Sequence, residues 1–389
     1  MPDPAAAGRG RAGTPLGLPL PRRAGRIGPQ PDHPDRDSTG GRVVSTSVAE
    51  QTPAEGAGGR TDDLLLRVDH LVKHFQVGGG FMKKPTTVYA VNDISFDLRR
   101  GETLALVGES GCGKTTVGKT LMGFYQPTSG SVRFDGREIG GLSRRELRSV
   151  RRDMQFVFQD PYASLPARST VQDILTEPLE IHGIGDRSAR IRRARELLEL
   201  VGLRSALASR YPHEFSGGQR QRIGIARALA LEPKMLVLDE PVSALDVSVQ
   251  AQVVNLLERL QQELDLGYVF IAHDLGVVRH ISDRIAVMYL GSIVEYGAAG
   301  DIFTDPQHPY TQALLSAVPI PDPRRKGMAR RRLLVGDLPS PTTEPAGCPF
   351  RGRCWRAQDI CATDKPPLEL SESGAEVACH FPGPERPAA

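Results

Sequence analysis

The stretch GESGCGKTT at residues 108–116 has the spacing G-x-x-x-x-G-K-[ST], follows an apolar run and precedes helical sequence. Its glycines would let backbone N–H groups wrap phosphate oxygens at the start of a helix, where the helix dipole favours anions. The lysine would contact the β- and γ-phosphates, and the first threonine would offer its hydroxyl to Mg²⁺. A chance glycine-rich turn is the alternative explanation. The residues expected at this phosphate site are Gly108, Ser110, Gly111, Cys112, Gly113, Lys114, Thr115 and Thr116.

Two acidic residues stand at the end of another apolar run, MLVLDE at residues 235–240. Asp239, beside the phosphate loop, would suit Mg²⁺ directly or through water. Glu240 is placed to polarise an attacking water. A solvated strand end is the alternative, and the unbroken apolar run that leads into both acids argues against it. The stretch FIAHD is a further apolar run that ends in polar residues, and it places His273 at the same edge of the sheet. We expect His273 to contact the γ-phosphate, although a lone histidine at such a position is more often structural.

A second anion site is predicted at FSGGQRQRIGIARALAL, residues 215–231, where a serine and two glycines open a helical run. A single ATP has little use for two such helix starts in one subunit. Two subunits that meet head to tail would use both, because each would give its second helix start to the partner's ATP. The stretch therefore predicts a dimer.

The elements that must position these residues alternate along the chain. LLLRVDHLVKHF at residues 64–75 alternates like a strand, and ETLALVG, KMLVLDEP and YVFIAHD are typical of buried strands. RIAVMYLGSIVEYG is also predicted to be strand. Residues 170–210 are helical and charged, and SVQAQVVNLLERLQQELDLG is a helical pattern that ends in glycine. Strands that alternate with helices predict an α/β domain with a largely parallel sheet.

The N-terminal segment differs from the rest. One third of residues 1–60 are Gly or Pro and none is aromatic, so we expect disorder, or a wrongly assigned start codon. No apolar run is long enough to span a bilayer, and no signal peptide is evident. The net charge of +3 gives no reason to expect nucleic acid as a partner. The protein is predicted to be cytoplasmic.

Together these motifs resemble the ATP-binding subunits of ABC transporters, over about residues 64–320. FSGGQ matches the ABC signature, with Phe215 where leucine is commoner. Gln159 in FVFQDPYASL matches the Q-loop, SALD, which ends at Asp246, matches the D-loop, and His273 matches the H-loop. Phe75 sits where the aromatic residue that stacks on adenine is expected.

The resemblance implies a P-loop NTPase (ABC ATPase) domain at residues 61–318 with a helical subdomain at about 163–230. Two such subunits would sandwich two ATP molecules, and the signature residues would reach the partner's γ-phosphate. Glu240, His273 and Gln159 are implied as catalytic residues, and Gln159 would also pass closure to membrane subunits. The residues implied as Mg²⁺ ligands are Thr115, Gln159 and Asp239, and those implied as further nucleotide contacts are Phe75, Ser216, Gly217, Gly218, Gln219 and Asp246.

A narrower resemblance is to the oligopeptide/dipeptide importer branch. YPHEFSGGQRQRIGIARAL and DPQHPYTQALLSAVP are typical of it, and PVSALDVS resembles the second of its two ATPase subunits. Pro166 and Ala167 replace the usual Asn-Pro near the expected membrane-subunit contact, and Cys112 stands where serine is common. The resemblance implies two permease subunits, a second homologous ATPase subunit as hetero- or homodimer, an extracytoplasmic solute-binding protein acting indirectly, and a place at the cytoplasmic face of the membrane.

Other functions stay open from sequence. Importers of the same branch handle nickel, glutathione and some sugars. A soluble ABC ATPase that acts on the ribosome or DNA belongs to a different class, and such proteins usually carry two cassettes or long coiled-coil insertions. This chain has one cassette and neither feature.

Four of the five cysteines lie near the C-terminus with the spacing C-x5-C-x6-C-x17-C. In the cytoplasm such a cluster more often holds a metal than disulfides, and the C-x2-4-C pairs usual for zinc are absent. Four thiolates suit a [4Fe–4S] cluster. The resemblance to the C-terminal extension of peptide-importer ATPases favours iron–sulfur, with zinc, free or disulfide-bonded cysteines as alternatives. We expect a linker at 319–345 with a basic run at 324–332, then a small Cys-rich extension at 346–389, with Cys348, Cys354, Cys361 and Cys379 as ligands and His380 as a weaker one.

Overall fold

The structure is a computed structural model that describes residues 63–78, 85–160, 164–318, 334, 336, 339–344 and 346–383. All of them belong to one compact unit of the chain. The predictions for residues 1–60 and for the basic run at 324–332 lie outside the described residues, as does most of the linker predicted at 319–345.

The central sheet has eight strands in the order β11-β12-β10-β9-β3-β8-β7-β6. Its parallel part is formed by β3 (Thr103–Val107), β6 (Met154–Val157), β7 (Met235–Asp239), β8 (Gly267–Ala272) and β9 (Arg284–Tyr289). Strands β3, β7 and β8 are buried along their whole length, which explains why they are continuous apolar runs in the sequence. The α/β prediction with a largely parallel sheet is confirmed.

The stretch RIAVMYLGSIVEYG forms two antiparallel strands, β9 and β10 (Ser292–Ala298). Leu290 and Gly291 turn the chain with φ of 43° and 81°. Two short strands from the C-terminal region, β12 (Glu376–Val377) and β11 (Glu369–Leu370), then extend the sheet beyond β10. The C-terminal region is therefore joined to the central sheet by backbone hydrogen bonds.

A second, antiparallel sheet has the strand order β2-β1-β4-β5. Its strands are β1 (Leu64–Val77), β2 (Thr86–Arg99), β4 (Ser129–Phe134) and β5 (Arg137–Glu138). The alternating pattern of residues 64–75 predicted β1, but not that this strand would leave the parallel sheet. Register is decided by pairing between segments far apart in the chain, which local patterns do not encode.

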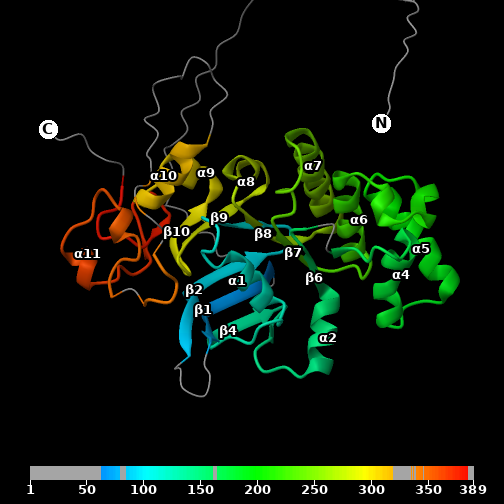
Figure 1. The fold of residues 1–389 in the computed structure, drawn as a ribbon, viewed down its shortest axis with the longest axis horizontal. Helices are drawn as coiled ribbons and strands as arrows, with labels where there is room; N and C mark the ends of the chain where they lie inside the picture. The colour runs from blue at the N-terminus through cyan, green and yellow to red at the C-terminus, as the bar shows by residue number, and fades with distance from the viewer. Residues whose placement is uncertain are drawn as a thin grey trace, which may run out of the picture. The chain divides into compact units, whose positions relative to one another are not determined.

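Two hydrophobic cores cover the two faces of the central sheet. Alternate residues of β3 point to opposite faces, so Ala105 and Val107 join one core while Leu104 and Leu106 join the other. Figure 1 shows α7, α8, α9 and α10 on one side of this sheet and α1 with the antiparallel sheet on the other. The helices are α1 (Lys114–Leu121), α2 (Arg144–Asp153), α7 (Val247–Leu264), α8 (Leu275–Ile281), α9 (Ala299–Thr304) and α10 (Pro309–Ala317).

A run of helices fills the segment between β6 and β7, where the helical subdomain is expected. Side chains set the helix starts: Thr170 caps α4, Asp186 caps α5 and Ser216 caps α6. Figure 1 shows α4, α5 and α6 at the β6 end of the sheet, away from β10. These elements are α4 (Val171–Ile181), α5 (Arg187–Leu200), η2 (Ser205–Ser209), η3 (Pro212–Glu214) and α6 (Gly217–Leu229).

The C-terminal region adds two short helical turns, η5 (Arg351–Arg353) and α11 (Ile360–Thr363). The Cys348 N–H donates to the Cys361 carbonyl at 2.9 Å, which holds the two turns side by side. Over the described ranges, no helix combines the length and the apolar character that a membrane span requires.

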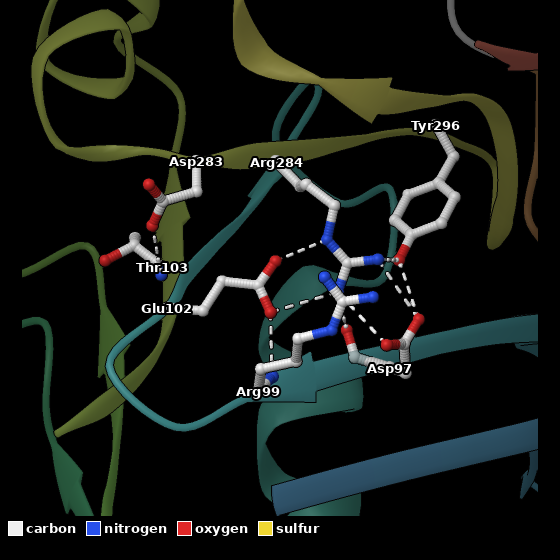
Figure 2. Close-up of polar contacts among 7 residues, drawn as sticks. All are labelled: Asp97, Arg99, Glu102, Thr103, Asp283, Arg284 and Tyr296. Carbon is white, nitrogen blue, oxygen red and sulfur yellow. Dashed lines mark hydrogen bonds and ion pairs between the residues drawn. The ribbon is translucent and has the colours of Figure 1, made fainter. Parts of the chain in front are cut away.

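An ionic cluster joins the two sheets, as Figure 2 shows. The Arg284 guanidinium on β9 bonds the carboxylates of Asp97, on β2, and Glu102, and it also donates to the Tyr296 hydroxyl on β10. Burial acts to lower the pKa of Arg284, but the hydrogen bonds to Glu102 and Asp97 outweigh it and raise the pKa. Arg284 therefore stays charged and fixes the antiparallel sheet against the central one.

Candidate nucleotide site

The loop at residues 108–113 leaves β3 and runs straight into α1. Gly108 has φ of 151°, and a Cβ there would lie 2.2 Å from the Met288 carbonyl oxygen. Gly113 has φ of 108°, and a Cβ there would lie 2.2 Å from the Ala90 carbonyl oxygen. Only glycine fits either position, so the loop packs closely on β2 and β9 and presents its backbone at the start of α1.

Lys114 is the first residue of α1, and its ammonium bonds back onto this loop. Nζ donates to the carbonyl oxygens of Gly108 at 2.7 Å and Glu109 at 3.1 Å. Cys112 is buried inside the loop with Sγ 3.7 Å from Nζ, and burial raises the pKa of its thiol. A buried, protonated thiol is unreactive, so we infer that Cys112 is a small structural residue of the loop.

A cavity of about 340 Å³ opens beside the loop. Nine of the predicted site residues line it, together with Val88, Ala90 and Pro341. Phe75 stands in its wall and packs edge-on against Tyr125, with ring centroids 5.1 Å apart. The predicted residues in its lining are Phe75, Ser110, Gly111, Gly113, Lys114, Thr115, Thr116, Gln159 and Glu240.

A hydroxyl and a carboxylate meet at the carboxyl edge of β7. Thr115 Oγ1 donates to Asp239 Oδ1 at 3.0 Å, and Asp239 is the last, buried residue of the strand. Burial raises the pKa of Asp239 above its usual range. Hydroxyl and carboxylate oxygens are ligands that Mg²⁺ accepts, so this pair fits the metal that the sequence predicts.

The three predicted catalytic residues converge on one oxygen atom. Glu240 Oε2 accepts from Gln159 Nε2 at 2.8 Å and lies 3.1 Å from His273 Nδ1. Glu240 has φ of 47°, and its N–H donates to the Ile271 carbonyl at 2.9 Å, which turns the side chain away from the strand. Its carboxylate is 16% exposed, half-sheltered at the mouth of the cavity.

The signature residues occupy a different place. Ser216 caps α6, and its hydroxyl accepts from the Gln219 N–H at 3.3 Å while the Gln219 amide accepts from the Ser216 N–H at 3.0 Å. Asp246 caps α7 by accepting from the Val249 N–H at 3.0 Å, and a hydrogen bond from Ser248 lowers its pKa. Neither helix start lines the cavity beside Lys114 within the described residues. One subunit thus separates the two predicted halves of the site.

Known families match both parts of the chain. Residues 91–243 match the family described as "ABC transporter", and residues 294–361 match "Oligopeptide/dipeptide transporter, C-terminal region". The oligopeptide transport ATP-binding protein AppF of Bacillus subtilis is 50% identical over 323 residues, which cover 82% of this chain and 98% of that protein. The chain belongs to the ATP-binding subunits of ABC transporters.

Two further comparisons agree with this ABC assignment. The oligopeptide transport ATP-binding protein OppF of Haemophilus influenzae is 50% identical over 321 residues, covering 82% of this chain and 97% of that protein. The solved dimer of the ATP-binding cassette MJ0796, bound to ADP and Pi, has a TM-score of 0.54 and 29% identity, over 60% of this chain and 99% of that one. The predicted P-loop ABC ATPase fold is confirmed.

Sequence reasoning missed the residues that the C-terminal region of this ABC subunit brings to the site. The Pro341 carbonyl accepts from the Tyr89 N–H at 2.9 Å, in the wall that also holds Phe75. Tyr310 and Arg353 both bond Glu109 in the phosphate loop. The sequence signals were the DPQHPYTQ stretch and the C-terminal cysteine stretch, which indicated the family branch but no contact.

The metal prediction for the C-terminal cysteines is not supported. Among the residues that the structure describes, no group of three or more His, Cys, Asp or Glu side chains is arranged to hold a metal ion. All four cysteines are free, and burial raises the pKa of Cys348, Cys354 and Cys379, the last to about 11. The His380 Nε2 atom bonds the Asp364 carbonyl at 3.0 Å. The predicted Cys-rich extension as a metal-bearing unit is likewise not shown.

Proposed function

We propose that this chain is the ATP-hydrolysing subunit of an ABC importer for oligopeptides or dipeptides. The observation that carries the proposal is the meeting of Gln159, Glu240 and His273 at one carboxylate oxygen beside the phosphate-loop cavity. The peptide assignment is supported by the C-terminal region match and by AppF and OppF, which are named for oligopeptide transport. Importers of nickel, glutathione or sugars, and soluble ABC ATPases acting on ribosome or DNA, are the alternatives.

The proposed chemistry is hydrolysis of the γ-phosphate by an attacking water. Phe75 stacks on adenine, while Lys114 and the loop N–H groups hold the phosphates. Thr115, Asp239 and Gln159 would hold Mg²⁺, which supplies charge neutralisation at the β- and γ-phosphates when bound. Glu240 accepts the proton of the attacking water, and Gln159 and His273 orient its carboxylate toward it.

The first proposed partner is a second homologous ATPase subunit, in a hetero- or homodimer. The start of α6 would complete the partner's site, since Ser216 and the glycines after it lie outside the cavity of their own subunit. The solved cassette with the same fold is a dimer, which supports this arrangement.

The other proposed partners are two permease subunits at the cytoplasmic face of the membrane, with a solute-binding protein acting indirectly. An apolar groove of about 250 Å³ lies between β6 and the helices α4 and α6. Phe158, 43% exposed, lies in this groove next to Gln159, which bonds Glu240. A permease segment bound in this groove would contact Phe158. One peptide bond joins Phe158 to Gln159, so movement of the segment would reach the nucleotide site directly.

The test is reconstitution in proteoliposomes with the permease and solute-binding subunits of a peptide importer from the same organism. We expect ATPase activity that rises when the binding protein is loaded with peptide, and peptide uptake that requires ATP. Stimulation by nickel or a sugar instead of peptide would replace the solute class. Co-purification with ribosomes or DNA and no membrane subunits would contradict the transporter assignment.

A further inference from the structure

The C-terminal region holds one residue of the phosphate loop from two sides. Glu109 follows Gly108 in the loop, and its N–H donates to the Tyr310 hydroxyl at 2.8 Å. Its carboxylate accepts from both terminal nitrogens of Arg353, with Nη1 2.6 Å from Oε2 and Nη2 3.0 Å from Oε1. Backbone and side chain of Glu109 are therefore both fixed by residues more than 200 positions away in the chain.

The ion pair between Arg353 and Glu109 has the geometry of a strong contact. It is bidentate and charge-assisted, and this kind of pair fixes direction as well as distance. The Arg353 side chain is 9% exposed and that of Glu109 is 28% exposed, so water screens the pair little. A surface ion pair of two mobile side chains would not position a loop, but this pair can.

The support behind Arg353 is rigid. Phe350, just before the η5 turn that carries Arg353, packs against Tyr289 and Tyr310 with ring centroids 5.2 Å and 5.4 Å apart. Tyr289 and Tyr310 also contact each other, with centroids 4.8 Å apart. All three rings are almost completely buried, so η5 is anchored on β9 and α10. The arginine is thus held on the folded core.

Glu109 also connects Arg353 to the phosphate-binding lysine. Its carbonyl oxygen accepts from Lys114 Nζ at 3.1 Å and from the Cys112 N–H at 3.3 Å. A shift of Glu109 would therefore move the turn of the loop and the ammonium of Lys114 together. Binding of phosphates by backbone N–H groups depends on the loop being already in shape, because ordering it on binding costs free energy.

We propose that Arg353 is a positioning residue for nucleotide binding, which acts through Glu109 and makes the C-terminal region part of the ATP site. Among the described residues, Arg353 is not one of those that line the cavity beside Lys114, so it sets affinity for MgATP through Glu109 and leaves the chemical step at Glu240 in place. The inference rests on the nucleotide site of the proposed function and not on the transported solute.

The experiment measures MgATP binding and steady-state ATPase kinetics on the full chain carrying Arg353→Met, Arg353→Lys or Glu109→Gln. We expect Arg353→Met and Glu109→Gln each to raise the Kd and KM for MgATP about tenfold while kcat changes less than about twofold. Arg353→Lys keeps the charge and should recover part of the affinity. The double variant Arg353→Met with Glu109→Gln should be no weaker than either single one, because both remove the same contact.

The matched control is Arg351→Met. Arg351 lies in the same η5 turn, but its side chain is exposed and bonds the Ala362 carbonyl instead of the loop. Its Kd for MgATP should equal that of the unsubstituted protein.

Two outcomes would overturn the proposal. In the first, the Arg353→Met protein melts at a lower temperature but keeps its Kd and KM for MgATP. Arg353 would then stabilise the C-terminal region without positioning the nucleotide site. Additive losses in the double variant would mean that the two residues act separately. If Arg353→Met fails to fold, the Kd and KM of Arg353→Lys and Glu109→Gln for MgATP test the proposal by the same criteria. Failure of the unsubstituted chain to bind MgATP would instead contradict the nucleotide site itself.

Discussion

At the scale of single residues, the chemistry depends on where Glu240 points. Its left-handed backbone takes it out of the line of β7, and Gln159 and His273 then hold one of its oxygens. Asp239, one residue earlier, instead bonds Thr115. Two adjacent carboxylates thus reach different partners, which agrees with the metal-binding role proposed for Asp239 and the water-activating role proposed for Glu240.

We expect Glu240→Gln to lower kcat for ATP hydrolysis by about 10²- to 10⁴-fold, because an amide cannot accept the proton of the attacking water. The Kd for MgATP should stay within about threefold, since Lys114 and the loop remain intact. Both are measured on the purified protein, with Glu372→Gln, an exposed carboxylate, as control. Near-normal turnover in Glu240→Gln would remove Glu240 from the base role.

At the scale of elements, helix α10 starts at a histidine that cannot take up a proton in the folded state. His308 caps the helix, and its Nδ1 accepts from the Tyr310 N–H at 3.0 Å. Complete burial lowers its pKa from the ordinary value of 6.5 to about 3. As the pH falls, His308 of the unfolded chain is protonated near pH 6.5, whereas His308 of the folded protein is protonated only near pH 3. The unfolded state is therefore favoured by proton binding, and the free energy of unfolding decreases as the pH falls from about 6.5 to about 3.

His308→Asn keeps a capping acceptor and removes this titration. Between about pH 7 and pH 5 the unsubstituted protein should lose about 2 kcal/mol more unfolding free energy than the variant. Urea unfolding at each pH measures it. Buried Glu295, whose pKa is raised, titrates in the opposite direction in both proteins, so the difference isolates the histidine. Equal pH slopes in the two proteins would show that His308 is solvated in solution.

The Arg284 guanidinium is one of the links between the two sheets, beside the hydrogen bonds of Asn92 to the turn between β9 and β10. Arg284→Met would leave the carboxylates of Asp97 and Glu102 without their cation, in a place where the Arg284 side chain is only 19% exposed. We expect a loss of about 3 kcal/mol in unfolding free energy, because uncompensated, partly buried charges remain. Denaturant unfolding measures this.

The control for this joint is Arg133→Met. Arg133 pairs with Glu138 at 3.4 Å with both side chains well exposed, so its loss should cost less than about 0.5 kcal/mol. Equal effects of the two substitutions would mean that Arg284 does not link the sheets energetically.

At the scale of the whole molecule, one subunit carries two helix starts predicted to bind anions, and they lie apart. The start of α1 lines the cavity, and the start of α6 does not. If ATP is hydrolysed in the proposed head-to-tail dimer, a substitution at the start of α6 should lower ATPase activity. It should leave the Kd of the single subunit for MgATP unchanged.

Ser216→Asp keeps the helix cap, since Asp is as good an N-cap residue as Ser, but places a negative charge toward the partner's γ-phosphate. We expect ATPase activity to fall about 100-fold or more, with the Kd of the isolated subunit for MgATP within about twofold. Size-exclusion chromatography with MgATP should show a lost dimer. Ser143→Asp, at the similar capping box of α2, is the matched control and should keep its activity. Equal loss in both variants would point to a capping defect.

Much of the site could be predicted from short stretches of sequence. Residues 108–116, the two acids at the end of β7 and the serine before α6 belong to local features: a turn with positive φ at its glycines, a strand end, a helix start. Each depends on neighbours a few positions away, so the pattern of residue types determines it. The parallel arrangement of buried strands followed for the same reason, because each strand is an unbroken apolar run.

Contacts across the chain were decided only by tertiary structure. Three examples are the split of residues 284–298 into a hairpin, the separate antiparallel sheet and the pairing of Arg353 with Glu109. In each case the local sequence of one segment does not indicate which segment it will contact. The cysteine spacing illustrates the same limit, because it suggested a metal, while the described residues hold no group of His, Cys, Asp or Glu side chains arranged to bind one. The sequence by itself determined the family of this ABC subunit and predicted the residues of its phosphate site. The tertiary structure decided that its C-terminal region holds the phosphate loop, because burial and long-range packing exist only once the chain has folded.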